Sequence, residues 1–136
     1  MTAGYSGTPL AKKLGIKEGF TVLAINAPGN YRDLLEPLPN NTKLTTKPAS
    51  NLDFIHLFTN GRDELFSGLA QYKNLIKQDG TIWVSWYKKA ARLPTEITED
   101  TVREAALPLG LVDVKVCAVD ERWSGLKLVI RKENRT

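Results

Sequence analysis

The sequence predicts a three-layer α/β domain whose sheet is mostly parallel and ends in an antiparallel hairpin. Residues 81–86 form a largely apolar run, which is typical of a strand buried on both faces. Strand-like and helix-like segments alternate along the chain, and this order favours parallel strands joined by helices. The last two strand-like segments lie too close together for a helical crossover, so we expect them to pair antiparallel.

The first half of the chain is expected to hold two short helices, two buried strands and one polar edge strand. In order, these segments are residues 9–14 (helix), 21–26 (strand), 31–36 (helix), 43–47 (edge strand) and 54–58 (strand). Thr8 can cap the first helix, Pro9 suits its first position, and Gly15 suits its end. Both buried strands are nearly continuous apolar runs, as expected for a sheet covered on two sides.

The second half is expected to begin with an amphipathic helix over residues 63–77, whose apolar side chains recur at helical spacing. The central strand, 81–86, follows it, and a basic loop leads to a third helix that starts at Thr98. Thr98 and Thr101 are both plausible caps for this helix, and Gly110 should close it. Residues 113–119 and 126–130 then form the hairpin strands.

Composition limits the classes of protein to consider. The 136 residues suit one domain, residues 1–136, with a sizeable core. Cys117 is the only cysteine, so the chain has no internal disulfide and no cysteine-built metal site. The net charge of +4 fits an anionic partner, but it also fits a solvated basic surface. No apolar run is long enough to span a bilayer and the start lacks signal-peptide features, so we expect a cytoplasmic protein without membrane contact.

Three stretches of the sequence are similar to a bacterial family of domains of unknown function, the DUF3052 type. They are residues 6–15 (SGTPLAKKLG), 83–89 (WVSWYKK), and 107–120 (LPLGLVDVKVCAVD) continued by 123–131 (WSGLKLVIR). Together they extend over most of the chain. This resemblance implies no particular catalytic residues.

The C-terminal order of helix, strand, tight turn and strand resembles the S-adenosylmethionine-dependent methyltransferase fold, whose last strand is antiparallel to the others. Residues 75–84 (LIKQDGTIWV) are similar to a helix–glycine–strand phrase late in that fold. The resemblance implies a Rossmann-like, methyltransferase-like architecture. It also implies a cofactor site at the first strand and its turn.

The residues of that expected cofactor site depart from the family pattern. The first turn, residues 26–31, has one glycine, and Pro28 removes a backbone donor. The second strand ends in Thr46-Lys47-Pro48, where an acidic residue usually binds ribose hydroxyls. Ser85-Trp86-Tyr87 does not match the Asn-Pro-Pro-Tyr motif of amino methyltransferases. The sequence therefore favours a scaffold whose usual cofactor site has been lost.

Ligands of open α/β sheets bind beyond the carboxyl ends of the parallel strands, and three such ends should meet here. The candidate ligand-site residues are Asn26, Pro28, Gly29, Asn30, Tyr31, Asn60, Arg62, Ser85 and Lys88. They offer amides, hydroxyls, an aromatic surface and cations, which suits an anionic or phosphorylated ligand. The alternative, that they only form turns and a solvated surface, stays open.

Five further residues carry side chains suited to chemistry or contact. His56 lies mid-strand and is expected to be a hydrogen-bonded core or edge histidine, not a metal ligand or a catalytic base. Cys117 is expected to be a small buried hydrophobe. Trp83 and Trp86 should point to opposite faces of their strand, one into the core. The other, or Trp123, is expected to be partly exposed.

The sequence thus favours a small non-catalytic binding or regulatory domain on a degenerate methyltransferase-like scaffold. The alternative is a transferase that binds S-adenosylmethionine or a nucleotide through an atypical first turn, so the cofactor stays open. An anionic small molecule or a protein is the expected partner, and the hairpin tip, residues 121–123, suits a homodimer contact. The basic loop 88–92 could hold nucleic acid, but core packing beside a solvated loop explains it more simply.

Overall fold

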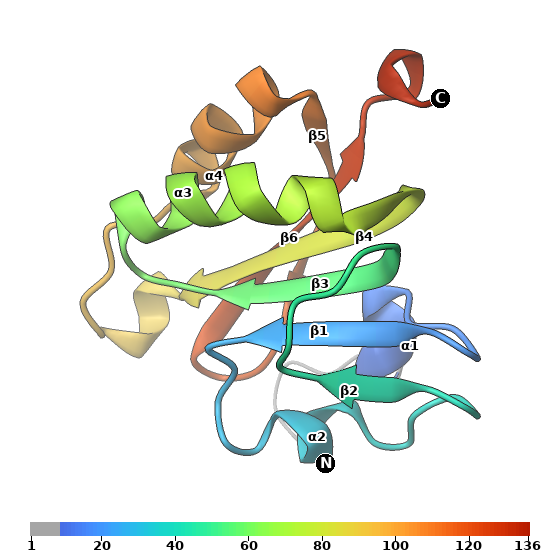
Figure 1. Cartoon of the computed structure of the whole chain (residues 1–136). Helices are drawn as coiled ribbons and strands as arrows, with labels where there is room; N and C mark the ends of the chain where they lie inside the picture. Colours follow the sequence, from blue (N-terminus) through green and yellow to red (C-terminus); the bar gives the residue numbers. More distant parts are fainter. Residues whose placement is uncertain (1–8) are drawn as a thin grey trace.

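The computed structural model describes residues 9–136, and its strands form one six-stranded sheet in the order β2-β1-β3-β4-β6-β5 (Figure 1). The strands are β1 (Thr21–Ile25), β2 (Lys43–Thr45), β3 (Leu52–Phe58), β4 (Ile76–Tyr87), β5 (Leu111–Ala118) and β6 (Trp123–Ile130). β2, β1, β3 and β4 run parallel, whereas β6 is antiparallel to both β4 and β5. The predicted mostly parallel sheet with an antiparallel C-terminal hairpin is confirmed. The polar strand β2 lies at an edge, as expected.

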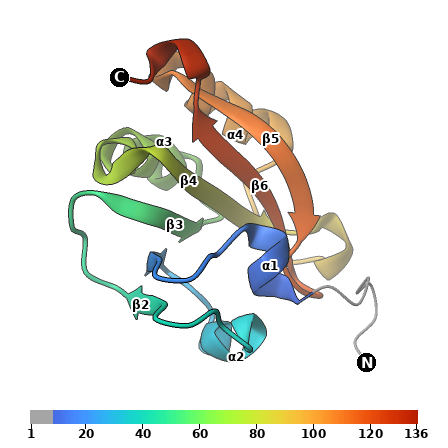
Figure 2. The ribbon, with the colours of Figure 1, turned by 90° about the vertical axis from the view of Figure 1, so that its right-hand side faces the viewer.

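The sheet is covered on both faces by helices, which gives three layers (Figures 1 and 2). The α-helices are α1 (Leu10–Leu14), α2 (Tyr31–Leu35), α3 (Arg62–Tyr72) and α4 (Glu99–Ala106). Short 3-10 turns occupy η1 (Lys73–Leu75), η2 (Lys89–Ala91), η3 (Leu107–Leu109) and η4 (Lys132–Asn134). Helices α3 and α4 share one apolar core with one face of the sheet, and α1 and α2 share a second core with the other face. The cap predicted at Thr8 lies outside the described residues.

Strand β4 supplies side chains to both cores because successive residues of a strand point to opposite faces. Val84 and Trp86 pack on the α3 and α4 side, and Trp83 packs on the α1 and α2 side. The opposite orientation of Trp83 and Trp86 is confirmed. The expected partial exposure is wrong, because Trp86 is 6% exposed and Trp123 is 8% exposed. Trp123 is covered because its indole packs against the rings of Phe58 and Tyr87.

The junction between α3 and β4 differs from the prediction. The helix was expected to reach Lys77, but it ends at Tyr72, and β4 already begins at Ile76. Ile76 pairs with Leu52 of β3, and the register then shifts before Thr81 resumes the ladder. Ile76 is buried as part of the strand that pairs with β3. The sheet therefore determines the structure here, although the apolar spacing of the sequence is helical.

The ends of helix α4 agree with the sequence. Thr101 N–H donates to Thr98 Oγ1 at 3.3 Å, and Thr98 N–H donates to Thr101 Oγ1 at 3.1 Å, which makes a reciprocal cap. After η3 the chain reaches Gly110 at φ +80°, the left-handed conformation that glycine adopts most easily. Within residues 9–136, no helix combines the length and the apolar character that crossing a membrane requires.

Candidate ligand-binding site

The turn after β1, residues 26–31, separates two cavities at the carboxyl edge of the parallel strands. Asn26 adopts φ +58°, a left-handed conformation that asparagine tolerates better than most residues, and it turns the chain sharply out of β1. Pro28 lines both cavities. We call the cavity toward β2 the turn–β2 cavity and the one toward the β5–β6 hairpin the turn–hairpin cavity.

The turn–β2 cavity has a volume of about 570 Å³. Ring and apolar surfaces form much of its wall, from Tyr31, Tyr72, Pro48 and Leu44. Its polar lining comes from Asn26, Thr45, Thr46 and Arg32. Among its described lining residues, Arg32 is the one that carries a charge. The guanidinium lies 3.7 Å from Glu36 with both side chains largely exposed, so that ion pair holds it only weakly.

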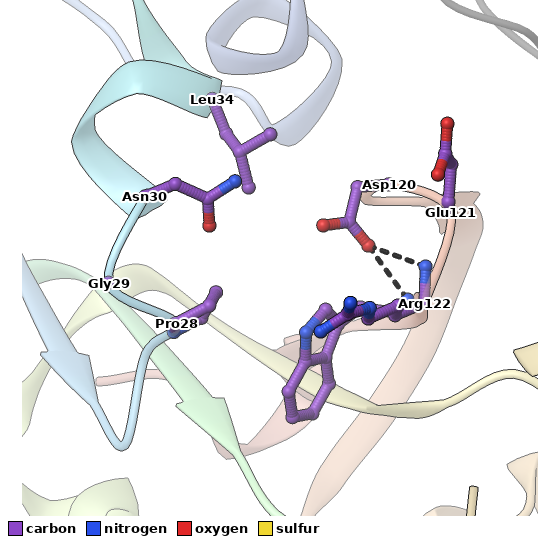
Figure 3. A pocket seen from close by; sticks show the side chains of 8 residues that line it. Pro28, Gly29, Asn30, Leu34, Asp120, Glu121 and Arg122 are labelled. Carbon is purple, nitrogen blue, oxygen red and sulfur yellow. Dashed lines mark hydrogen bonds between the residues drawn. The ribbon is translucent and has the colours of Figure 1, made fainter.

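The turn–hairpin cavity has a volume of about 540 Å³ and lies between the first turn and the tip of the β5–β6 hairpin (Figure 3). Its lining residues are Pro28, Gly29, Asn30 and Leu34 on one side and Asp120, Glu121, Arg122 and Trp123 on the other. Asp120 Oδ1 accepts hydrogen bonds from the backbone N–H groups of Arg122 at 2.8 Å and Trp123 at 2.9 Å. The Asp120 carboxylate therefore has a structural task, closing the hairpin turn.

A chain of three buried polar side chains connects the turn–β2 cavity to the middle of the sheet. The Tyr31 hydroxyl lies 2.8 Å from His56 Nδ1, and His56 Nε2 lies 2.7 Å from Ser85 Oγ. His56 and Ser85 are fully buried, and Tyr31 is 4% exposed. Burial lowers the pKa of His56 to about 3 and raises the pKa of the Tyr31 phenol well above its usual value. His56 is therefore neutral at pH 7, one ring nitrogen donates and the other accepts, and the expected hydrogen-bonded core histidine is confirmed.

Of the nine predicted ligand-site residues, five line one or both of the two cavities and four line neither. Asn26, Pro28 and Tyr31 line the turn–β2 cavity, and Pro28, Gly29 and Asn30 line the turn–hairpin cavity. The other four residues line neither cavity: they are Asn60, Arg62, Ser85 and Lys88. The first turn is thus brought together as one unit, whereas the ends of β3 and β4 contribute mainly to internal contacts.

Each of the four outlying residues makes another contact, through its side chain or, for Lys88, through its backbone. Asn60 Oδ1 accepts the backbone N–H of Tyr87 at 2.8 Å, and the backbone N–H of Lys88 donates to Arg122 O at 2.8 Å. Ser85 is bonded to His56, as described above. Arg62 makes two hydrogen bonds to Glu104, at 3.1 and 2.7 Å, and its guanidinium lies 4.6 Å from the centre of the Phe66 ring. The hydrogen bond to Glu104 raises the pKa of Arg62.

The cavity linings also include residues beyond the nine that the sequence predicts. Arg32 follows the predicted turn by one position, so extending that turn would have included it. Thr46 and Pro48 stand where an acidic residue is usual in that fold, and the sequence does not indicate that they line a cavity. The helical spacing predicts Tyr72 on the apolar face of α3, and no pattern in the sequence indicates that it also lines the turn–β2 cavity.

Cys117 is half-buried, not fully buried as the sequence suggested. It lies on the edge strand β5, and its side chain packs only partly against the α1 and α2 core. Burial raises the pKa of its thiol, while the positive charges of Lys13 and Lys115 act in the opposite direction. No cluster of three or more histidine, cysteine, aspartate or glutamate side chains within residues 9–136 is arranged to hold a metal ion.

Solved methyltransferase structures share this fold over most of their length. A SAM-dependent methyltransferase from Aquifex aeolicus superposes with a TM-score of 0.65 at 18% sequence identity, covering 89% of this chain and 87% of that chain. A putative type 11 methyltransferase from Sulfolobus solfataricus gives 0.66 at 17% identity, with 93% and 92% covered. An S-adenosylmethionine-dependent methyltransferase from Clostridium acetobutylicum gives 0.61 at 8% identity, with 89% and 87% covered. At these identities the likeness establishes a methyltransferase-like fold.

The sequence itself matches a family model. None of the curated proteins matches this sequence. The family model described as "Protein of unknown function (DUF3052)" matches residues 29–132, which include the end of the first turn, the whole sheet from β2 onward and both long helices. This chain therefore belongs to the DUF3052 family, on a methyltransferase-like α/β fold.

Proposed function

We propose that this chain is a non-catalytic binding domain that takes an anionic small molecule with a flat ring into the turn–β2 cavity. The observation that carries the proposal is the lining of that cavity, where aromatic and proline surfaces accompany a single cation, Arg32. The position also supports it, because open α/β sheets bind ligands beyond the carboxyl ends of their strands. We take the cytoplasm, expected from the sequence, as its compartment.

The lining favours a nucleotide over S-adenosylmethionine. S-adenosylmethionine carries a positive sulfonium and a positive amino group, and the described residues that line the cavity include no carboxylate to balance them. A nucleotide instead carries negatively charged phosphates, and Arg32 can form charge-assisted hydrogen bonds with them. Thr45 and Thr46 offer hydroxyls where an acidic residue usually binds ribose, and Tyr72 offers a ring surface for a base.

The alternative is a transferase that binds S-adenosylmethionine through an unusual set of contacts. The observation that favours it is the fold, which superposes on methyltransferases over about nine-tenths of this chain. Against catalysis stands the chemistry of the lining. The Tyr31 phenol is held neutral by burial and is hydrogen-bonded to a neutral histidine. That leaves it a poor general base at neutral pH.

Calorimetric and thermal-shift titrations with AMP, ATP, S-adenosylmethionine and S-adenosylhomocysteine test the proposal. We expect at least one nucleotide to bind, since a ligand at one hundred times its Kd adds about 2.7 kcal/mol to the free energy of unfolding. Arg32→Ala should weaken that binding about tenfold or more, because a hydrogen bond to a charged group contributes about 1.5–3 kcal/mol. Arg62→Ala removes the same charge outside the cavity and should leave the affinity unchanged.

Three results would contradict this assignment. Equal losses in the Arg32→Ala and Arg62→Ala variants would place the ligand elsewhere or show only a general charge effect. Binding of S-adenosylmethionine and S-adenosylhomocysteine in preference to nucleotides would support the transferase alternative. A complete absence of binding across the four compounds would exclude both.

A further inference from the structure

Four lysines gather on the sheet face beside α1, at the β5–β6 side of the molecule. We call Lys13, Lys17, Lys115 and Lys127 the lysine patch. Lys115 and Lys127 are cross-strand partners in the β5–β6 ladder. The Lys115 ammonium donates to the Lys13 carbonyl oxygen at 2.9 Å, and Lys127 Nζ lies 3.6 Å from the position that a Cβ on Gly15 would take. The segment around α1 and the β5–β6 hairpin, which are about a hundred residues apart in the sequence, therefore lie side by side here.

The sheet register explains why this face carries lysines instead of apolar side chains. Lys127 pairs with Trp83 of β4, and cross-strand partners share a face of the sheet. Trp83 is covered by α1, where its indole N–H donates to the Leu14 carbonyl oxygen at 2.8 Å. Helix α1 has only five residues, and beyond it the sheet continues into β6 and the edge strand β5 (Figure 2). Lysines occupy that outer part, where Lys115 is exposed and Lys127 is partly buried.

The charges in the patch repel one another. Burial and the positive charges of Lys115 and Lys17 lower the pKa of Lys127. Within the part of the chain that the structure describes, no carboxylate forms an ion pair with Lys17, Lys115 or Lys127. Elsewhere in the described chain, Arg62, Lys77 and Arg103 are examples of cations that are paired with an acid. A bound anion would relieve this repulsion, so the patch is complementary to negative charge.

We infer that the lysine patch is a docking surface for the sugar–phosphate backbone of a nucleic acid. A small anion would be better served by an enclosing cavity, and these lysines line neither the turn–β2 cavity nor the turn–hairpin cavity. The patch instead offers the ammonium groups of Lys17, Lys115 and Lys127, which come from the loop after α1 and from two strands, on an open face. Lysines that contact phosphates in this way supply affinity and orientation without reading sequence.

This surface is distinct from the basic loop 88–92, and it does not depend on the proposed ligand in the turn–β2 cavity. Lys127 lies opposite Trp83, four positions before the end of β4, whereas Lys88 follows that end. Arg32, the cation of the turn–β2 cavity, does not belong to the patch. Failure of the nucleotide experiment would therefore leave this inference standing, and the reverse also holds.

Fluorescence anisotropy with labelled 20-nucleotide single-stranded and duplex DNA, measured from 50 to 200 mM salt, tests the inference. We expect Kd values of about 10⁻⁴–10⁻⁶ M that weaken with salt, because each neutralised phosphate contributes about −0.7 (single strand) to −0.9 (duplex) to the slope of log K against log salt. Lys17→Gln/Lys115→Gln, which changes two exposed side chains, should weaken binding about tenfold and make that slope shallower by about 1.4–1.8.

The control is Lys47→Gln/Lys89→Gln, which removes the same charge from two exposed lysines outside the patch, one of them in the basic loop. Its affinity and salt slope should stay close to those of the unmodified chain, and Arg32→Ala should also bind normally. Lys127→Gln, checked by circular dichroism for folding, should weaken binding in the same direction as the first variant. Equal losses in patch and control variants would overturn the inference. So would the absence of salt-dependent DNA binding, including the case in which the chain binds only anionic lipid vesicles.

Discussion

Among single residues, the buried His56 carries the clearest physical consequence. It is enclosed between Tyr31 and Ser85, and its ring stacks on Phe58 with centroids 4.1 Å apart. A cationic imidazole there would lose hydration and find no carboxylate in these contacts. The folded state therefore keeps His56 neutral, and folding is coupled to the pH of the solution.

We predict that acid weakens the fold through His56. Its pKa is about 3 in the folded state and near 6.5 in an unfolded chain, so between these values only the unfolded chain takes up the proton. The free energy of unfolding should therefore fall as pH drops below about 6.5, at a rate that approaches about 1.4 kcal/mol per pH unit. Urea unfolding at several pH values from 7 to 4.5 measures this. His56→Leu should be less stable at pH 7 but should show a flatter pH dependence, and an unchanged dependence would contradict the assignment.

The sequence indicates where His56 lies, but it does not indicate what it binds. Its position within the apolar run Phe54-Ile-His-Leu-Phe58 predicts burial, because a strand in a covered sheet has no exposed face. Its two partners are 25 and 29 residues away, and only the packing of β3 between β1 and β4 brings them within hydrogen-bonding distance. For the same reason, the sequence predicts Tyr31 as a site residue without predicting its link to the core.

For strands and helices, continuous apolar runs and capping residues predicted most of the positions. β1, β3 and β4 were found because buried strands are apolar on both faces, and α4 was found because its cap uses local hydrogen bonds. The junction at residues 72–81 was not found, because a pairing between Ile76 and Leu52 decides it. The candidate site follows the same division. The first turn is a continuous segment that the sequence identifies by itself. The wall that β2 contributes could not be predicted, because it depends on which strand pairs with β1.

The contact between β6 and β4 predicts a strong effect of a small substitution. A Cβ on Gly125 would lie 3.0 Å from Trp83 Cε3 and 3.3 Å from Ser85 Oγ, closer than packed atoms normally approach. We expect Gly125→Ala to lower the free energy of unfolding by about 1–3 kcal/mol, because both neighbours are fully buried and cannot move freely. Chemical denaturation measures the change.

Gly29→Ala is the matched control for Gly125→Ala. A Cβ at Gly29 would meet no atom within 4 Å, and the backbone there is not left-handed. Its free energy of unfolding should change by no more than about 1 kcal/mol, with a gain being the expected direction because alanine restricts the unfolded chain. Similar losses in the two variants would show that β6 can shift away from Trp83.

In the whole molecule, the two apolar cores are joined through the sheet and not through the helices. β3 and β4 place side chains in both cores, and their ladder lies at the centre of the strand order. Each core contains at least one tryptophan: Trp86 lies in the α3 and α4 core, and Trp83 and Trp123 lie in the other. A loss of either core would remove the packing of the central strands.

We therefore predict that the molecule unfolds in one cooperative transition. Tryptophan fluorescence and far-ultraviolet circular dichroism should give the same denaturation midpoint, as a two-state transition requires. Leu65→Ala in the α3 and α4 core and Leu35→Ala in the α1 and α2 core each truncate a fully buried side chain, at an expected cost of about 2–5 kcal/mol. Each should lower both midpoints together, while Val116→Ala, at a side chain on the exposed edge strand, should change them little.

Separate midpoints in the Leu35→Ala variant would mean that the layer built on α1 and α2 unfolds by itself. The continuity of β4 through both cores argues against that result, because Trp83 cannot lose its cover without exposing the strand that also carries Val84 and Trp86.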